Sequence, residues 1–387
     1  MPDIEIREIQ EREISAFVDF QYELYKNDPY WIGDLKSSVR ALLSLSHPFW
    51  KHAERKLWLA CRQGRPVARI AAIINQTHND FHNEKTGFFG FFETANDAEA
   101  ARALVLKAEG WLKESGMDRM RGPVNPSTND MCGLLISGFD SYPKVMMPYN
   151  PPYYGEMLEG CGLSKIKDLH AYIRFSEQPL SERIEKIISR IQTRKDWRAR
   201  EIRLSDLGRE LETVREIYND AWSENWGFVP ISREEMAFAA KELRPVLKPK
   251  YGCIIEVDNR PAAFSIVLPD INQALRPLRG ELNPLNFIKL LVEMRRIRQS
   301  RLLMLGVRKE FRSRGFELIL IKHAINTARE CGWLHGELSW ILEDNYKIIS
   351  VIEEIGGRLY KKYRIYSKEF YEQPPMLRPE ISSSQFF

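Results

Sequence analysis

The sequence predicts an α/β (α+β) fold of two tandem domains, each with a mixed, mostly antiparallel twisted sheet flanked by helices. The main observation is an internal repeat. A turn at residues 63–68 (Gln-Gly-Arg-Pro-Val-Ala) stands between two apolar runs rich in β-forming residues, and residues 258–263, 195 positions later, repeat this arrangement. One repeat with so long a period indicates a duplicated domain and not a solenoid. A chain of 387 residues is long enough for two domains of ordinary size.

The end of each copy follows a common order of signals. In the first copy, Asn150 precedes a short helical segment, a turn at Gly162 and an aromatic strand. In the second copy, Asn345 precedes a short helical segment, a turn at Gly356 and another aromatic strand. Strand signals that gather early in each copy and alternate with helices later favour a sheet of mixed direction.

These signals place the first domain at residues 1–175 and the second at residues 201–372. A basic, helical connector joins them at 176–200, and a Pro- and Ser-rich tail follows at 373–387. The elements expected in the first domain are, in order, a strand at 4–6, a helix at 12–25, a strand pair at 57–74, a strand at 87–92, a helix at 97–115 and a strand at 117–122. A loop of 27 residues, 123–149, then interrupts the pattern, and loops of this length are usually functional or mobile.

The second domain repeats this plan with additions. A helix is expected at 207–222, and Ser232 with Glu235 forms a capping box at the start of another helix. The elements expected after it are a strand pair at 253–268, an inserted helix at 283–301, a strand at 302–307, a helix at 316–331, a strand at 336–341, a short helix after Asn345 and a last strand.

Composition indicates a globular protein that can bury two cores, with 44% hydrophobic and 28% charged residues. The net charge of +4 is too small to indicate binding of nucleic acid. No run of 18 apolar residues occurs, and the charged first 13 residues do not form a secretory signal, so we expect a cytoplasmic protein. His78 and His82 have the spacing of two metal ligands on a helix, but no third ligand follows. A polar loop is the better interpretation, and no metal is expected.

The strongest chemical signal is a basic turn between a buried strand and an apolar helix in the second copy. Backbone N–H groups and the positive end of the helix dipole meet at such a turn, and arginine side chains add bidentate donors. This arrangement predicts a pyrophosphate site. Its predicted residues are Val307, Arg312, Ser313, Arg314, Gly315, Phe316 and Glu317.

In this segment the chain resembles the GNAT superfamily of acyl-CoA-dependent acyltransferases. The phosphate loop of that superfamily has the pattern Gln/Arg-x-x-Gly-x-Gly/Ala, which Arg312 and Gly315 match and Glu317 does not. The order of the elements downstream also matches, and the resemblance implies that Asn345 binds the pantetheine arm of acyl-CoA. The tyrosine that often serves as the acid in the superfamily would fall at Ile352, so this role is not carried over.

The first copy has the same elements without the phosphate loop. Its equivalent turn at 93–97 (Glu-Thr-Ala-Asn-Asp) is acidic and would repel a pyrophosphate. We therefore expect this copy to have lost the cofactor and to shape the acceptor pocket or the interface between the domains. The resemblance implies a substrate-pocket position for Asn125 and Asn129 in the long loop and for Trp226.

Acyl transfer to an amine needs a base that takes a proton from the attacking ammonium. The carboxylates nearest the expected reaction centre are Glu343 and Asp344, directly before Asn345, and Glu337 on the same strand is a second candidate. Tyr366 on the last strand is a candidate acid. The alternative for each carboxylate is an exposed or capping position, and the alternative for the tyrosine is packing within the strand.

From about residue 20 to residue 370 the chain is similar to a bacterial group of tandem GNAT proteins, through phrases such as Glu-Asp-Asn at 343–345. Proteins of this type are similar to bacterial ceramide synthases, which transfer a long acyl chain from its thioester to a sphingoid amine. The resemblance implies an acyl-CoA-dependent N-acyltransferase with a sphingoid or other lipid amine as acceptor. Two alternatives stay open: an N-acetyltransferase of a small soluble amine, and a non-catalytic module that binds acyl-CoA or a partner.

The inserted segment 283–301 bears on the acceptor. It has a broad apolar helical face and ends in a cluster of arginines, Arg295, Arg296, Arg298 and Arg301. Basic residues near a helix C-terminus suit the dipole of any packed helix. The same pattern is also typical of a helix that lies on an anionic membrane surface. Both interpretations stay open, packing against the protein body and contact with the inner face of the membrane.

Overall fold

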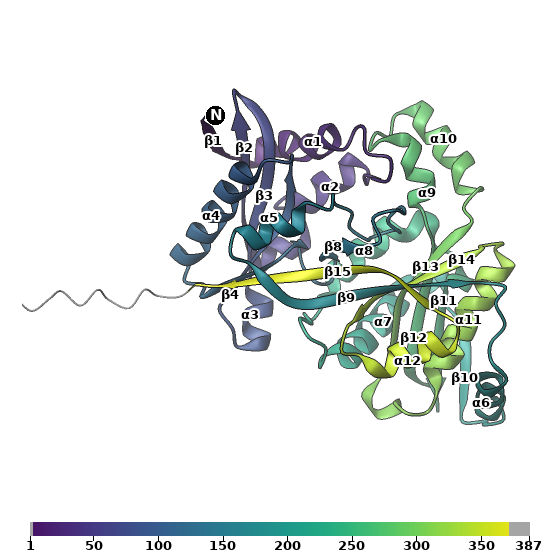
Figure 1. Cartoon of the computed structure of the whole chain (residues 1–387). Helices are drawn as coiled ribbons and strands as arrows, with labels where there is room; N and C mark the ends of the chain where they lie inside the picture. Colours follow the sequence, from purple (N-terminus) through teal and green to yellow (C-terminus); the bar gives the residue numbers. More distant parts are fainter. Residues whose placement is uncertain (1–2, 371–387) are drawn as a thin grey trace, which may run out of the picture.

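The computed structural model describes residues 3–370 of the chain, which form one long, twisted sheet with helices on both faces and a separate small sheet of two strands (Figure 1). The order of the strands is β1-β2-β3-β4-β5-β15-β9-β14-β13-β12-β11-β10. Only the pairs β4–β5 and β13–β14 are parallel, and the other neighbours along this path are antiparallel. The predicted mixed, mostly antiparallel sheet is confirmed.

The strands follow one another along the chain in two similar series. Those of the first series are β1 (Ile4–Glu8), β2 (Ala53–Arg62), β3 (Arg65–Asn75), β4 (Thr86–Thr94), β5 (Arg119–Gly122), β6 (Val124–Asn125), β7 (Met131–Cys132), β8 (Leu134–Ser137) and β9 (Ser164–Phe175). Those of the second series are β10 (Trp197–Glu201), β11 (Gly252–Val257), β12 (Arg260–Pro269), β13 (Gln299–Val307), β14 (His335–Leu342) and β15 (Arg358–Glu369).

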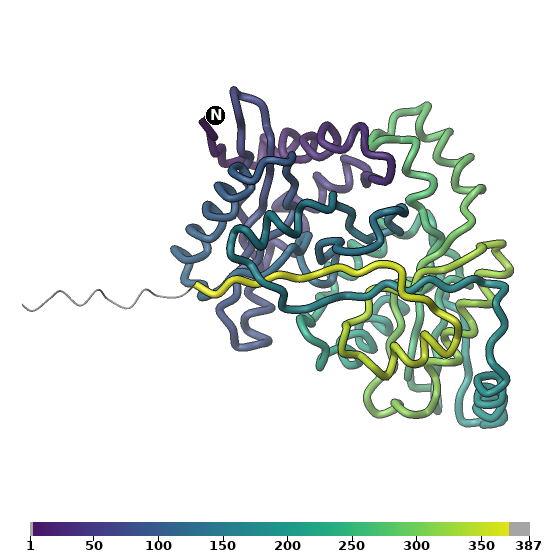
Figure 2. Tube along the Cα trace, in the orientation of Figure 1, coloured from purple at the N-terminus to yellow at the C-terminus, as the bar shows by residue number. Residues whose placement is uncertain are grey.

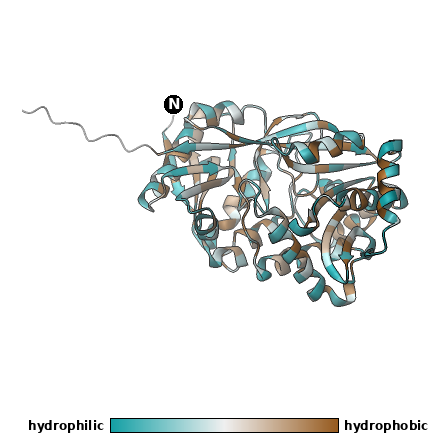
Figure 3. Ribbon diagram, turned by 90° about the horizontal axis from the view of Figure 1, so that it is seen from below, coloured by the Kyte–Doolittle hydropathy of each residue, from teal (hydrophilic) through white to brown (hydrophobic). Residues whose placement is uncertain are grey.

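The helices alternate with these strands. They are α1 (Ile14–Leu24), α2 (Lys36–Leu43), α3 (Gln76–His82), α4 (Ala98–Glu114), α5 (Tyr154–Gly160), α6 (Glu182–Gln192), α7 (Leu207–Trp222), α8 (Arg233–Leu243), α9 (Asn272–Leu275), α10 (Pro284–Met294), α11 (Phe316–Glu330) and α12 (Tyr346–Glu354). The predicted capping box is present, because Ser232 accepts from the backbone of Glu235 and Glu235 accepts from that of Ser232. Brown and teal residues alternate around many of these helices, as one face packs on the sheet and the other meets solvent (Figure 3).

The last strand of each series completes the sheet of the other series. β15 pairs with β5 of the first series, and β9 pairs with β14 of the second. The two long strands also pair with each other, from Arg358 opposite Ile173 to Ser367 opposite Ser164. Figure 2 shows them side by side across the middle of the molecule. The two copies are therefore joined by an exchange of strands and not only by the connector.

The core lies on both faces of this sheet. In the first half one cluster of buried side chains includes Phe17 of α1, and another includes Leu104 of α4. In the second half, Leu320 of α11 and Ile217 of α7 belong to clusters of their own. Tyr363 of β15 is completely buried in a first-half cluster, so a residue of the second series completes a first-half core.

Four segments differ from what the sequence predicted. The predicted connector helix ends at Gln192, and the chain continues into the edge strand β10. The predicted loop 123–149 contains the short strands β6 to β8. The segment around His78, for which a polar loop was preferred, is the helix α3. The inserted helix ends at Met294, and Arg301, predicted near its end, lies in β13 with only 4% of its surface exposed.

Candidate functional site

The parallel strands β13 and β14 separate beside a cavity. The two strands pair only from Gln299 to Leu302, opposite His335 to Leu338, and then diverge. A cavity of about 190 Å³ lies where they separate. Its walls come from both strands, from α7, from the segment after α7, from α12 and from the first-half loop, and they are mainly apolar. This geometry suits an extended ligand that enters between the strands.

The corresponding opening in the first half is filled by the chain itself. β4 and β5 pair only from Thr86 to Phe88, opposite Arg119 to Arg121. Beyond that point β6 lies close to β4, and a Cβ atom on Gly90 would be 1.6 Å from the carbonyl oxygen of Val124. The side chain of Asn125 accepts a hydrogen bond of 2.6 Å from the backbone N–H of Phe91. Asn125, predicted for the substrate pocket, thus closes this opening and lines a separate cavity of about 150 Å³.

The predicted phosphate loop leads from the end of β13 to the start of α11. Val307 still pairs with Ala263 of β12, and the chain then turns through Ser313 (φ 64°) and Gly315 (φ 78°) into the helix. Within residues 3–370, the backbone N–H groups of 313–317 find no protein acceptor. A run of free donors at a helix N-terminus can receive an anion such as a pyrophosphate. Gly315 is also crowded, since a Cβ there would come within 2.4 Å of Ile191.

The basic side chains of this loop are paired with carboxylates. Arg312 donates to Glu224 at 3.0 Å and to the carbonyl of Ala221 at 2.7 Å. Arg314 donates to Asp196. Both arginines are partly exposed, so an incoming phosphate could exchange with these carboxylates. Glu317 lies in the first turn of α11, where a carboxylate suits the helix dipole.

Asn345 and Ile352 belong to the same cavity. The side-chain oxygen of Asn345 caps α12 by accepting from the N–H of Ile348 at 3.4 Å, and the residue also lines the cavity. Ile352, at the position where the superfamily often has a tyrosine, is buried and lines the cavity too. The cavity therefore has no hydroxyl at that position.

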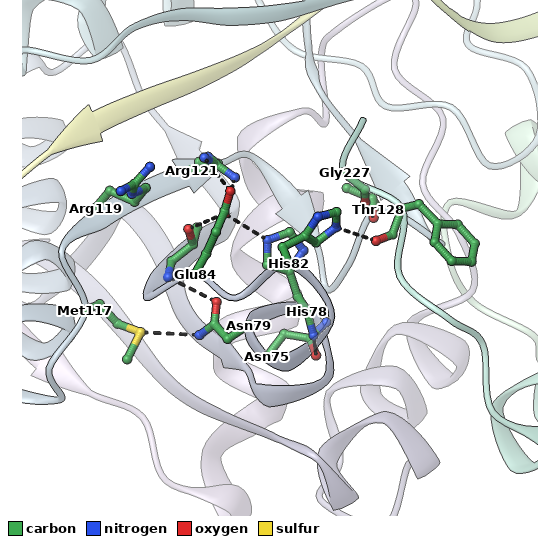
Figure 4. Close-up of polar contacts among 12 residues, drawn as sticks. Asn75, His78, Asn79, His82, Glu84, Met117, Arg119, Arg121, Thr128 and Gly227 are labelled. Atoms are coloured by element: carbon green, nitrogen blue, oxygen red, sulfur yellow. Dashed lines mark hydrogen bonds and ion pairs between the residues drawn. The ribbon is translucent and has the colours of Figure 1, made fainter. Parts of the chain in front are cut away.

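The first half supplies one wall of the cavity through the turn between β6 and β7. Three successive carbonyls of the segment after α7 accept hydrogen bonds from first-half side chains. Thr128 donates to Gly227 at 2.6 Å, Asn129 donates to Val229 at 3.1 Å, and a ring nitrogen of His82 lies 2.8 Å from the oxygen of Phe228. Figure 4 shows Thr128 and Gly227 together beside His78 and His82, with the hydrogen bond from His82 as a dashed line. Asn129 and Trp226, both predicted for the substrate pocket, line the cavity.

His78 and His82 support these contacts between the first half and the segment after α7. The His78 and His82 rings are 4.5 Å apart, and His78 lies 3.4 Å from Glu84, which also pairs with Arg121 at 2.7 Å (Figure 4). Burial lowers the pKa of His78 to about 4, so the ring is neutral near pH 7. The cluster holds α3 against the sheet, and α3 in turn positions His82.

The three predicted catalytic residues lie in three different places. Glu337 is completely buried behind the cavity wall, where Ser339 and Tyr360 donate to its carboxylate and the Arg301 Nε is 3.7 Å away. Glu343 accepts from the Lys165 ammonium at 2.6 Å and from the N–H of Asp168 at 3.0 Å, and it does not line the cavity.

Tyr366 lies in a core cluster of the first half, where it donates to Glu159 at 3.2 Å. Burial raises its pKa to about 12. For Glu343 the net shift is the opposite: partial burial by itself would raise its pKa, but the hydrogen bonds from Lys165 and from the N–H of Asp168 together hold the pKa below the usual value. Neither residue is brought to the opening between β13 and β14.

Three polar residues of the cavity had no place in the sequence-based site. Arg301 donates from Nε to Ser339 at 2.9 Å and from a terminal nitrogen to the carbonyl of Val145 at 2.7 Å, which ties the first-half loop to β13 and β14. Ser339 lines the cavity in front of Glu337. Asp130 lines it from the first half. The sequence contained one indication of Asp130: it directly follows Asn129 in the polar turn at 126–130, which was predicted to lie at the substrate pocket.

Comparison with known proteins points to acyl transfer. No protein-family model matches the chain. The chain is 33% identical over 368 residues to Protein YghO of Escherichia coli (strain K12), covering 93% of this chain and 94% of that protein. It is 34% identical over 364 residues to the Bacterial ceramide synthase of Caulobacter vibrioides (strain NA1000 / CB15N), covering 92% and 94%.

Similar solved structures include two proteins of the same fold. A tandem GNAT protein from the clavulanic acid biosynthesis pathway has a TM-score of 0.57 at 12% identity and covers 96% of this chain and 100% of its own. A GCN5-related N-acetyltransferase from Sphaerobacter thermophilus has a TM-score of 0.52 at 12% identity, covering 96% and 98%. At this identity these two structures bear on the fold alone.

Proposed function

The chain belongs to the family of tandem GNAT acyltransferases that includes the bacterial ceramide synthase, and from this premise we propose that it transfers an acyl chain from acyl-CoA to a lipid amine. The enzyme class, an acyltransferase, follows from the family. The donor and the acceptor are the proposed parts.

The single observation that carries the choice of donor is the loop at the end of β13 together with the cavity beside it. Five successive free N–H groups, two arginines and the start of α11 meet at one point, which suits a pyrophosphate. Residues 301–305 of β13, the strand that leads into this loop, line the cavity, and Asn345 lines it too, which suits a pantetheine arm. The proposed donor-binding residues are Val307, Arg312, Ser313, Arg314, Gly315, Phe316, Glu317 and Asn345.

Replacing Arg314 with glutamine tests the donor site. The change removes one positive charge beside the free N–H groups, so we expect the Kd for acyl-CoA to rise about tenfold, or ~1.4 kcal/mol. Calorimetric titration with acetyl-CoA and palmitoyl-CoA measures it. Arg65→Gln removes the same charge at the exposed start of β3 in the first half and is expected to change little. Equal weakening by both variants would contradict a donor site confined to the second half.

The proposed acceptor is a lipid amine, for which the inserted helix α10 provides support. None of its residues is buried; Leu290 and Met294 pack on the cluster that includes Ala274 of α9, and the rest of the apolar face points outward. Leu285 is 79% exposed, and the other exposed apolar side chains here are Leu282, Phe287, Ile288, Leu291 and Val292. Figure 1 shows α10 beside α9 at the upper right, at the edge of the molecule.

The charges around α10 favour an anionic membrane surface as its partner. Arg295, Arg296 and Arg298 follow the helix and are exposed. A helix with an exposed apolar face and a basic border binds in the interface of a bilayer. None of the helices within residues 3–370 has the length and apolar character needed to cross one. We therefore propose peripheral contact, through which the enzyme would take its acceptor from the membrane.

Replacing Arg295, Arg296 and Arg298 with glutamine is expected to weaken binding to anionic vesicles by a hundredfold or more, since each charge contributes about 1 kcal/mol near such a surface. Co-sedimentation with phosphatidylglycerol vesicles at low salt measures it. The matched control replaces Arg183, Lys186 and Arg190, three exposed basic residues of α6, and is expected to bind as the unmodified protein does. If the unmodified protein does not sediment with these vesicles, membrane contact through α10 is refuted.

A further inference from the structure

The proposed acyl transfer requires a proton acceptor inside the cavity. The acceptor amine is an ammonium ion near neutral pH and cannot attack until it has lost a proton. Among the residues that line the cavity, within the described part of the chain, the one carboxylate is Asp130. Glu343 lies outside it, and the oxygens of Glu337 are covered by Ser339 and Tyr360.

We infer that Asp130, a residue of the degenerate first half, is the general base for the acyl transfer catalysed by the second half. This inference rests on the proposed function. It gives the first copy a catalytic task although its own opening is closed by Val124 and Asn125.

The turn that carries Asp130 is held rigidly. Ser127 donates from its hydroxyl to the Asp130 carboxylate at 2.7 Å, and β6 and β7 pair at the base of the turn. The two residues before Asp130 are bonded to the opposite wall, Thr128 to Gly227 and Asn129 to Val229. Tyr218 of α7 also donates to the Asn129 side chain at 2.6 Å. A base held this way needs no rearrangement when substrate arrives.

The surroundings of Asp130 suit a base that works near neutral pH. Burial raises its pKa to about 7, and the negative charge of Glu235 on α8 adds to the rise, while the Ser127 hydroxyl opposes it. Glu235 is itself paired with His52 at 3.4 Å. The other titratable groups around the site are Tyr218, Cys132 of β7 and Arg301 of β13. A base with a pKa near the working pH is the most effective one.

The amine loses two protons during the reaction, one to Asp130 and one to the CoA thiolate. Asp130 takes one proton from the ammonium, and the free amine nitrogen forms a bond to the thioester carbonyl carbon. The carbon–sulfur bond then breaks with its electron pair moving to sulfur. The second N–H proton goes to the thiolate, so that the products are an amide, free CoA and a proton held on Asp130 for release to solvent.

Two variants test this assignment with palmitoyl-CoA and sphinganine as substrates and CoA thiol release as the readout. Asp130→Asn is expected to lower kcat by 10²–10⁴ while the Kd for palmitoyl-CoA stays within about twofold. Asp118→Asn, the same change at an exposed first-half aspartate, is the control. Ser127→Ala retains the carboxylate but removes its hydrogen-bond donor, so the acid limb of the kcat/KM profile is expected to move from about pH 7 to higher pH.

The outcomes separate the two proposals. An unmodified protein that binds neither palmitoyl-CoA nor any other acyl-CoA, and releases no CoA, would overturn the proposed function. An active protein whose Asp130→Asn variant keeps kcat within twofold of the control would overturn the role of Asp130 alone. If the Asp130→Asn variant fails to bind palmitoyl-CoA, the Ser127→Ala variant provides the test. An acid limb of its kcat/KM profile that stays at the pH of the unmodified protein would overturn the role of Asp130 as the base.

Discussion

A chain that ends at Gly357 is expected to lose the fold of both halves, although it lacks only β15 and the residues after it. β15 pairs with β5 and β8 of the first half and with β9, which in turn completes the second half through β14. Tyr363, Ile365 and Tyr366 of this strand are at most 1% exposed. Each buried side chain of this size contributes about 1.5–3 kcal/mol, and a domain has a total stability of only about 5–15 kcal/mol.

The measurement is the yield of soluble protein together with the cooperativity of its urea unfolding. A chain that ends at Phe370 retains every described strand and is the control; it is expected to unfold like the full chain. The same reasoning predicts that residues 1–175 produced alone will not fold, because β9 then has neither β14 nor β15 beside it. A soluble, cooperatively unfolding 1–175 fragment would contradict the importance of the strand exchange.

Replacing Arg301 with alanine is expected to lower the free energy of unfolding by about 3–5 kcal/mol, the usual cost of leaving one partner of a buried ion pair alone. Arg301 is 4% exposed and Glu337 is completely buried. The variant also loses the hydrogen bonds from Arg301 to the carbonyls of Val145 and Met146, which fasten the first-half loop to β13.

Urea unfolding of the two proteins measures this loss. Arg65→Ala removes an exposed arginine and is expected to change the free energy of unfolding by no more than about 0.5 kcal/mol. A loss below 1 kcal/mol for Arg301→Ala would show that the arginine is dispensable for joining the halves. The cavity wall at Met146 would then have to be held by other contacts.

The sequence by itself determined the types of most elements and the position of the basic turn that we propose as the donor site. These features depend on residues close together in the chain: the apolar periodicity of α7, the capping box at Ser232, and the basic turn at 312–315. The acidic segment 93–97 likewise predicted a first copy without a phosphate loop; in the structure Val124 lies against Gly90, in the opening between β4 and β5.

Only the tertiary structure decided which strand pairs with which copy and which carboxylate reaches the cavity. β9 and β15 are both 12 residues long and have similar burial patterns, so neither sequence pattern indicates whether the strand completes the sheet of its own half or that of the other half. Asp130 and Arg301 acquire their positions from partners more than 90 residues away, as in the bonds from Thr128 to Gly227 and from Arg301 to Val145. Burial and charge at such sites arise from packing between distant segments, which local propensity does not encode.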